Sequence, residues 1–253
     1  MKFFLLLSLA LIINAIPMRD IVPHTDPNLP LFIGISLSDY YHNKRHLYNS
    51  LALSTVFDNA LVLTGMSIDE VTHNNTFNFL NEKVVFDPNK ILCEGQALTK
   101  KTLNRFILSK NKNPYANLNH YHNDGVPIIF YISGHGNGKY LSLRDHELWN
   151  LKAIDTVAQN SPVIVFLETC KARNHINYMK YASMVVSSDY NEESKAIGVD
   201  DDAYYMTDEW SHKLYEYMKQ IKLNFMNITE FVGNLDGFSN LKHHYIHTPY
   251  ESI

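Results

Sequence analysis

The stretches VPIIFYISGHG (residues 126–136) and PVIVFLETCKA (residues 162–172) decide the fold of this chain. Each begins with an almost unbroken apolar run, at Val126–Ile132 and at Pro162–Leu167. Such runs are typical of strands in a parallel sheet that is covered on both faces. The first predicted strand runs directly into the glycines and the histidine of SGHG, and the second runs into the polar residues of ETCK.

Weaker patterns elsewhere in the chain predict further strands with helices between them. We expect strands at Leu31–Ser36, Asn59–Leu63 and Met184–Ser187, and helices at His46–Phe57, Leu98–Leu108, Asp145–Ala158 and Thr207–Ile221. Alternating strands and helices with right-handed crossovers give an α/β fold, a three-layer sandwich with a mostly parallel central sheet and helices on both faces. In such sheets, functional residues gather at the carboxyl ends of the strands.

Composition narrows the class of protein. The 253 residues suit one large domain, because single hydrophobic cores stop growing at about 250–300 residues. Lys and Arg total 22 against 26 Asp and Glu, so the formal charge of −4 leaves no basic surplus for nucleic acid. The two cysteines, Cys93 and Cys170, exclude a disulfide-stapled scaffold.

The first residues resemble a secretory signal peptide. Lys2 precedes the apolar run Phe3–Ile13, and Asn14–Ala15 offers a small-residue cleavage site. We therefore expect residues 1–15 to be a signal peptide and residues 16–253 to form a single domain in the secretory pathway. An uncleaved anchor and a buried first helix are the alternatives. No later segment has 18 consecutive apolar residues.

Two strand ends carry the candidate chemistry. Glycines flank His135, so its imidazole and backbone can approach a substrate closely. Cys170 follows the other buried strand and is a candidate nucleophile. A free thiol has a pKa near 8.5, and a nearby imidazole can take its proton and return it to a leaving amine. Backbone N–H groups in both turns can stabilise an oxyanion. Taken alone, the cysteine could be a small core residue and the Gly-His-Gly triplet a simple turn.

These motifs together resemble the caspase-like clan of cysteine peptidases, in which a strand leads into SGHG and a later strand into ETC-KA. The segment NKRHLYN, residues 43–49, is similar to the Asn-Tyr-Arg-His-x-x-Asn segment of the legumain family. Within that family, the chain resembles the catalytic subunits of glycosylphosphatidylinositol (GPI) transamidases. The resemblance extends from about Leu31 to about Ile221 and implies a caspase-like fold and a caspase-like catalytic domain.

The resemblance implies a role for individual residues. Cys170 would be the nucleophile, His135 the general base and Asn43 the residue that orients the imidazole, while Gly136 and Cys170 would supply oxyanion N–H groups. Five further positions match the family's substrate pocket, and these are Arg45, His46, Glu168, Ser194 and Asp208. No cofactor or metal is expected: the family's calcium ligands have no counterpart in Asn89–Glu94, and Asp58 alone is a poor site.

The resemblance also implies a reaction and a location. The enzyme would cleave a C-terminal GPI-attachment signal through a thioester on Cys170 and pass the new C-terminus to the ethanolamine amine of a GPI lipid. Its partners would be proproteins with that signal, the GPI lipid, and membrane-embedded transamidase subunits that hold it at the membrane in the endoplasmic reticulum lumen. The long C-terminal extension of legumain-type proteases is not expected.

Two alternatives stay open. One is a legumain-like endopeptidase that cuts after Asn or Asp. The other is a non-enzymatic binding module, although retention of Asn43, His135 and Cys170 argues against it. Cys93 matches none of the motifs and is expected to be a buried thiol.

Overall fold

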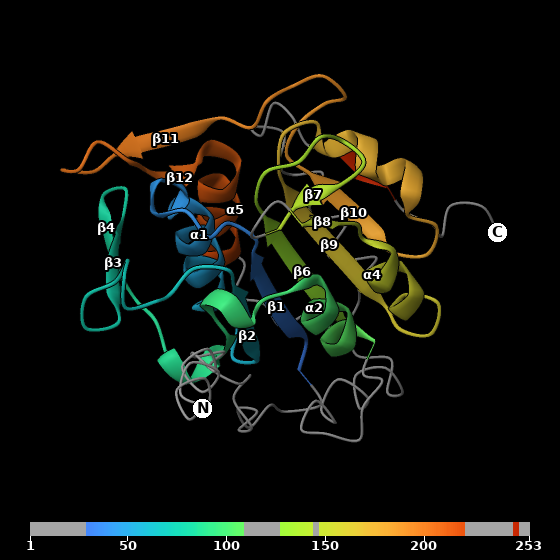
Figure 1. Cartoon of the computed structure of the whole chain (residues 1–253), viewed down its shortest axis with the longest axis horizontal. Helices are drawn as coiled ribbons and strands as arrows, with labels where there is room; N and C mark the ends of the chain where they lie inside the picture. The colour runs from blue at the N-terminus through green and yellow to red at the C-terminus, as the bar shows by residue number, and fades with distance from the viewer. Residues whose placement is uncertain (1–28, 109–126, 144–146, 221–244, 248–253) are drawn as a thin grey trace, which may run out of the picture.

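The computed structural model describes residues 29–108, 127–143 and 147–220, and the backbone of residues 245–247. One sheet dominates these residues, with strands in the order β13-β10-β9-β6-β1-β2-β5 (Figure 1). Six strands run parallel and β13 pairs antiparallel with β10. The strands are β1 (Leu31–Ser36), β2 (Ala60–Thr64), β5 (Ile91–Cys93), β6 (Ile128–Ser133), β9 (Val163–Glu168), β10 (Ser183–Val186) and β13 (Tyr245–His247).

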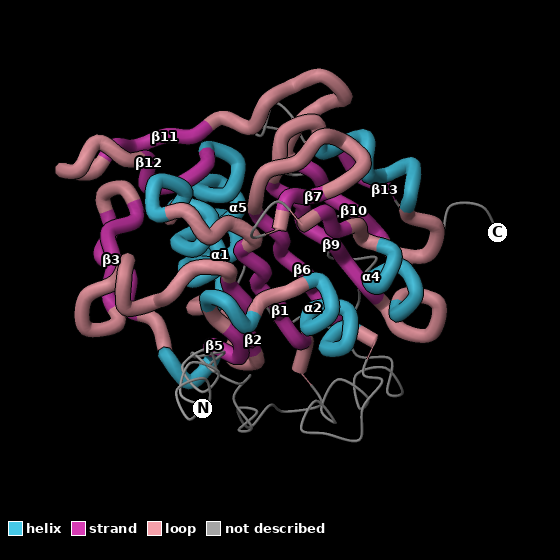
Figure 2. Tube along the Cα trace, in the orientation of Figure 1, coloured by secondary structure: helices cyan, strands magenta, loops and turns pink. Residues whose placement is uncertain are grey.

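The helices connect these strands, and three short hairpins extend from the sheet (Figure 2). The α-helices are α1 (Arg45–Ser54), α2 (Lys100–Ile107), α4 (Lys152–Val157) and α5 (Glu209–Gln220). Short 3-10 helices are η1 (Tyr41–Asn43), η2 (Pro88–Lys90), η3 (Gly95–Ala97) and η5 (Ala172–Tyr178). The hairpins pair β3 (Thr76–Phe79) with β4 (Glu82–Val85), β7 (Leu141–Ser142) with β8 (Leu148–Trp149), and β11 (Ala196–Val199) with β12 (Tyr205–Asp208).

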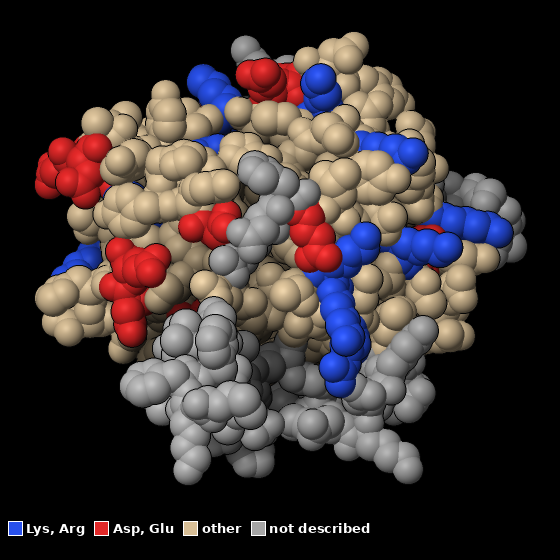
Figure 3. Space-filling model, viewed as in Figure 1, with Lys and Arg blue, Asp and Glu red and all other residues tan. Residues whose placement is uncertain are grey.

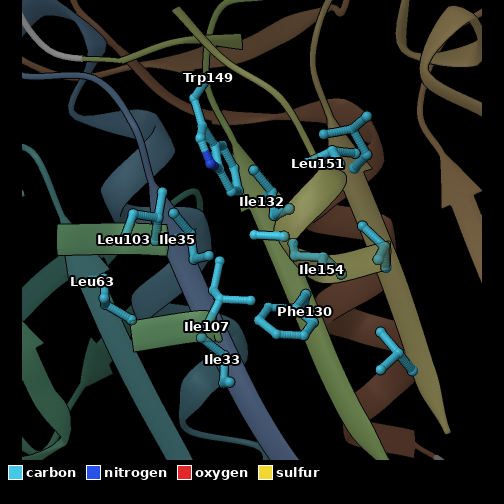
Figure 4. Close-up of a cluster of buried hydrophobic side chains, with 14 of the residues drawn as sticks. Ile33, Ile35, Leu63, Leu103, Ile107, Phe130, Ile132, Trp149, Leu151 and Ile154 are labelled. Atoms are coloured by element: carbon cyan, nitrogen blue, oxygen red, sulfur yellow. The ribbon is translucent and has the colours of Figure 1, made fainter. Parts of the chain in front are cut away.

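Alternation along the buried strands places one core on each face of the sheet. On β6, Phe130 and Ile132 face α2 and α4, where they pack near Ile107 and Ile154 (Figure 4). The intervening Ile129 and Tyr131 belong to the other core, with apolar residues of α1 and α5. Both faces of the strands are therefore covered, which explains the continuous apolar runs. The predicted three-layer α/β sandwich with a mostly parallel sheet is confirmed.

Two predicted helices were too long at their N-terminal ends. The helix predicted at Asp145–Ala158 begins only at Lys152, and Leu148 and Trp149 form β8 instead. Leu148 is exposed and Trp149 fully buried, an alternation of period two that suits a strand. The helix predicted from Thr207 begins at Glu209, since Thr207 and Asp208 pair with β11. The predicted strands and the other helices are present, within three residues of the expected ends.

Several predictions fall outside the described residues, among them the signal peptide at residues 1–15. Among the helices that are described, none combines the length and the apolar character needed to cross a membrane. Over the face seen in Figure 3, basic and acidic side chains form small separate groups rather than one basic patch. This scattering agrees with the small net charge of the sequence.

Candidate active site

The register of the central strands places the two motif loops next to each other. Ser133, the last residue of β6, pairs with Glu168, the last residue of β9. The ladder continues one step further, because the Gly134 N–H donates to the Glu168 carbonyl at 3.2 Å. His135 and Cys170 each follow two residues after this pair. Parallel pairing therefore brings the predicted base and the predicted nucleophile to the same edge of the sheet.

Close packing explains the glycines around His135. A Cβ on Gly134 would lie 2.9 Å from the Cβ of Leu37, and a Cβ on Gly136 would lie 2.5 Å from the Oγ1 of Thr169. Real Cβ atoms do not approach other atoms this closely, so neither position accepts a side chain without movement. The loop that carries His135 is thus packed tightly against the residue that precedes Cys170.

The backbone hydrogen bonds around Gly136 leave its own N–H without an acceptor among the described residues. The Ser142 N–H donates to the His135 carbonyl at 2.8 Å, and the Asn137 N–H donates to the Tyr140 carbonyl at 3.1 Å. These bonds flank Gly136, whose own N–H has no hydrogen bond to another described residue, and the same holds for the N–H of Cys170. Two unpaired N–H groups at the ends of neighbouring strands are suited to bind an oxyanion.

Short hydrogen bonds hold the turn after Cys170. Lys171 adopts a left-handed conformation with φ of 56°, and its N–H donates to the Glu192 carbonyl at 2.7 Å. The Ala172 N–H donates to the Ser188 hydroxyl at 2.9 Å, and that hydroxyl donates to the Thr169 carbonyl at 2.7 Å. Cys170 itself is half-buried and is not part of a disulfide. The thiol thus sits on a fixed turn and stays partly accessible.

Asn43 connects helix η1 to His135. Its Nδ2 lies 2.9 Å from the Nε2 of His135, and its Oδ1 accepts a hydrogen bond from the Nη1 of Arg45 at 3.0 Å. Asn43 is buried, whereas His135 is exposed. The predicted orienting contact between Asn43 and His135 is therefore present in the structure.

Buried polar side chains surround Asp208 at the end of β12. Its Oδ1 accepts from the Arg45 Nε at 3.0 Å, and its Oδ2 accepts from the Asn49 Nδ2 at 2.8 Å and lies 3.5 Å from the His46 Nδ1. We call Arg45, His46, Asn49 and Asp208 the Asp208 cluster. Burial alone would raise the pKa of Asp208, but the hydrogen bonds and charges of His46 and Arg45 together lower it. The carboxylate is held ionised.

Glu168 lies at the buried end of β9 and accepts two serine hydroxyls. Ser194 donates to its Oε1 at 2.5 Å and Ser211 to its Oε2 at 2.8 Å. Burial, and after it the negative charge of Asp208, raise the pKa of Glu168 to about 8. The site therefore contains one ionised carboxylate, Asp208, and one carboxyl group that keeps its proton near neutral pH.

Both histidines of the site are held neutral. Partial desolvation of the ring first, and then the neighbouring His46 and Arg45, lower the pKa of His135 to about 4 against the opposing effect of Asp208. Burial also lowers the pKa of His46, whose Nδ1 lies 2.7 Å from the Ser133 Oγ. The two rings meet edge to face with centroids 5.4 Å apart. An unprotonated His135 next to a half-buried thiol has the components of a nucleophile and base pair.

The structure brings the nine predicted site residues to one region at the carboxyl ends of β6 and β9. Sequence reasoning gave no role to three residues that complete it: Asn49, Ser211 and Thr207, whose hydroxyl donates to the Asn49 Oδ1 at 2.5 Å. Asn49 was available as the last residue of the NKRHLYN segment. Ser211 and Thr207 follow no motif, and only tertiary contacts reveal them.

Other predictions concern residues away from this site. Cys93 is buried and reduced, as predicted, and burial raises the pKa of its thiol to about 12. Within the described ranges, no three His, Cys, Asp or Glu side chains come together in a way that could hold a metal ion.

Of the comparisons with known proteins, the one with solved structures finds similar proteins. The sequence matches no protein-family model and no curated protein. Among solved structures, the chain is similar to caspase-1 from Spodoptera frugiperda, with a TM-score of 0.45 and 11% sequence identity over 78% of this chain and 70% of that one. At this level of similarity the match says nothing about substrate or reaction.

Proposed function

We propose that this chain is a cysteine-dependent transamidase that cleaves a C-terminal GPI-attachment signal and transfers the new C-terminus to the ethanolamine amine of a GPI lipid. The observation that carries the proposal is the contact between Asn43 and His135, beside the loop of Cys170. The three residues that the legumain-family motifs nominate come from three separate parts of the chain. A binding module would have no need to orient an unprotonated imidazole beside a free thiol.

The first half of the reaction forms a thioester. The Cys170 Sγ gives its proton to His135 and attacks the carbonyl carbon of the signal peptide bond. The carbonyl oxygen takes up negative charge and is bound by the N–H groups of Gly136 and Cys170. When the tetrahedral intermediate collapses, the carbon–nitrogen bond breaks and His135 returns the proton to the leaving amine.

The second half transfers the acyl group. The ethanolamine amine attacks the thioester carbon and loses a proton to His135, and the Cys170 thiolate leaves and is then reprotonated. Water in place of the amine would give hydrolysis, so the partition between the two nucleophiles defines the enzyme as a transamidase or a peptidase. The proposal includes partner subunits in the membrane and a location in the endoplasmic reticulum lumen, in keeping with the signal-like segment at residues 1–15.

A second candidate is a legumain-like endopeptidase, and the Asp208 cluster favours it. The Arg45 guanidinium can donate to the side-chain carbonyl of an Asn substrate, and the Asp208 carboxylate can accept from its amide NH₂. The same cluster could bind the peptide backbone of a substrate with a small residue at this position. Recognition alone therefore does not separate the two candidates.

The nature of the accepted nucleophile separates them. The full chain, purified with the membrane proteins that accompany it, would be incubated with a proprotein that carries a GPI signal, with and without hydroxylamine. A transamidase forms the C-terminal hydroxamate and little free acid. A peptidase forms free acid and also cleaves small Asn peptides. Cys170→Ala and His135→Ala should abolish both products and leave the circular dichroism spectrum unchanged, and activity retained in either variant would rule out both enzymes.

A further inference from the structure

Arg45 determines which way the Asn43 amide points. The Nε of Arg45 is anchored on Asp208 at 3.0 Å, and its Nη1 donates to Asn43 at 3.0 Å. A guanidinium only donates hydrogen bonds, so the atom of Asn43 that faces it must be Oδ1. The amide nitrogen then necessarily faces His135.

This orientation fixes the tautomer of His135. The Asn43 Nδ2 also only donates, so the His135 Nε2 at 2.9 Å must accept and carries no proton. The proton of the neutral ring is then on Nδ1. In this arrangement Nε2 is occupied by Asn43 and Nδ1 holds a hydrogen, so the ring has no free lone pair for the proton of Cys170.

Rotation of the Asn43 amide by a half turn would exchange the donor and acceptor roles of Asn43 and His135. Oδ1 would then accept from a protonated Nε2, and Nδ1 would offer its lone pair to the thiol. The tautomer changes when Nδ1 releases a proton to water and Nε2 takes one from water, with no net change in charge. However, the rotated amide would point its NH₂ group at Nη1 of Arg45, and two donors facing each other are unfavourable.

We infer that Arg45 is a positioning residue that keeps His135 from acting as a base until a substrate oxygen takes the hydrogen bond of Nη1. The inference rests on the proposed function and names the chemistry of the trigger: a carbonyl or carboxylate oxygen of the acyl donor, bound beside the Asp208 cluster. Because the guanidinium is rigid and planar, Nε stays on Asp208 while a substrate oxygen replaces the Asn43 Oδ1 as the acceptor at Nη1. In the free enzyme the imidazole thus cannot take the proton of Cys170, and substrate binding switches the imidazole to a base.

Removal of Arg45 also changes the local charge around His135, so the test needs a readout that charge alone does not move. His135 is faced by His42 from η1, by Arg45 and His46 from α1 and by Asp208 from β12. Removal of the positive Arg45 would by itself disfavour a nearby thiolate and slow the alkylation of Cys170. Release of the Asn43 amide predicts the opposite, because His135 can then take the thiol proton. Loss of Arg45 also removes a charge that lowers the pKa of His135, so faster alkylation supports the switch only together with a changed tautomer of His135.

The test measures alkylation of Cys170 by iodoacetamide in the free full-length chain between pH 5 and pH 9, followed by mass spectrometry. Arg45→Met should alkylate about tenfold faster than the wild type at pH 6.5, which corresponds to a shift of about one unit in the pH profile. Asn43→Asp should behave in the same way, because its carboxylate accepts from both Arg45 and a protonated Nε2. Arg173→Met, which removes a guanidinium paired with Asp189 instead, should not accelerate the reaction.

Arg45→Met removes the ion pair of Arg45 with Asp208 and could disturb folding. Asn43→Asp keeps this ion pair, so it tests the switch even if Arg45→Met folds poorly. A direct observation of the tautomer completes the test. NMR of protein with ¹⁵N-labelled histidines shows which ring nitrogen carries the proton, and the His135 signals are assigned by comparison with His135→Gln. The free wild type should carry the His135 proton on Nδ1, and Asn43→Asp should carry it on Nε2.

A wild-type proton on Nε2, or unchanged alkylation profiles in both variants, would overturn the switch. These results leave the proposed function intact if thiol-dependent transfer persists. A Cys170 that no electrophile modifies in any variant, together with absent activity, would instead remove the proposed function.

Discussion

The Asn43 Nδ2 lies 2.9 Å from the Nε2 of His135, although 92 positions separate the two residues in the sequence. The contact exists because β1 and β6 are neighbouring parallel strands, with Ser36 paired to Ser133. After the end of β1 the chain passes through helix η1, whose last residue is Asn43. His135 lies two residues after the end of β6. Parallel strands place both side chains at the same edge of the sheet.

Loss of the Asn43 amide should impair turnover more than substrate binding. In Asn43→Ala, the imidazole loses the group that orients it, and we expect kcat to fall by about 10- to 100-fold, less than the loss in His135→Ala. KM should change by less than kcat. Steady-state kinetics of acyl transfer measure both. Asn78→Ala, at an exposed position of β3, is the matched control and should match the wild type; an Asn43→Ala enzyme as active as this control would contradict the orienting role.

The contact of Gly136 with Thr169 gives a second prediction. In Gly136→Ala the new Cβ would lie 2.5 Å from the Thr169 Oγ1, so either the Thr169 side chain or the loop must shift, and we expect the loop to shift and carry its N–H away from the oxyanion position. We expect kcat to fall by about 10²- to 10³-fold, the usual cost of one lost oxyanion donor. Gly136→Ala combined with Thr169→Ala removes the clash and should recover part of the activity. Equal activity of the single and the double variant would show that this clash is not the cause.

The raised pKa of Glu168 predicts a dependence of stability on pH. An unfolded glutamate titrates near 4.3, whereas Glu168 in the folded chain titrates near 8, so between these values the folded state holds a proton that the unfolded state has lost. The stabilisation is complete below the unfolded pKa and disappears as the pH rises to about 8. Between pH 7 and 8 this group lowers the free energy of unfolding by up to about 1.4 kcal/mol per pH unit.

Glu168→Gln should remove this slope, because an amide does not titrate. Urea unfolding at pH 6.5, 7, 7.5, 8 and 8.5 measures the slope in each variant. Glu209→Gln is the control. Hydrogen bonds from Lys213 and Lys195 lower the pKa of Glu209 to about 2, so Glu209 does not titrate between pH 6.5 and pH 8.5. If Glu168→Gln keeps the slope of the wild type, Glu168 is already ionised at pH 7 in the folded chain.

Lys44 connects the Asn43 segment to the turn after β11. Its Nζ lies 2.5 Å from the Oδ2 of Asp200 and 4.4 Å from the centre of the Tyr41 ring, and its side chain is almost fully buried. Burial alone would lower the pKa of Lys44, but the hydrogen bonds to Asp200 and Tyr41 raise it. The ammonium is therefore charged in an enclosed site and depends on its partner.

Asp200→Asn should destabilise the chain more than Lys44→Met. The first variant leaves a buried charge without its partner, which costs about 3–5 kcal/mol in other proteins. The second replaces the ammonium with an apolar side chain of similar length that can pack beside Tyr41. Urea unfolding of both variants and of the double variant measures the difference. A larger loss in Lys44→Met would show that packing of the lysine stem, rather than its charge, holds this segment.

The residues by themselves determine the strands and the nature of the fold. The runs at Val126–Ile132 and Pro162–Leu167 are apolar on both faces, and such strands are stable only when helices cover both sides of the sheet. Prediction failed where the pattern was short. Leu148 and Trp149 lie in a segment whose spacing resembles a helix, but Trp149 is buried against Asn104, to which its Nε1 donates at 2.9 Å. Tertiary packing outweighs local propensity there.

His135 and Cys170 could be selected from the sequence, because glycines around a histidine and a cysteine after a buried strand are local patterns. Their surroundings could not. Only the register of β6 and β9 places the two loops at one edge, and only the contacts among Arg45, Asn43 and Asp208 fix the tautomer of His135. The reason is physical: hydrophobic periodicity is written along the chain, whereas hydrogen-bond direction and pKa depend on partners that are distant in sequence and meet only in the fold.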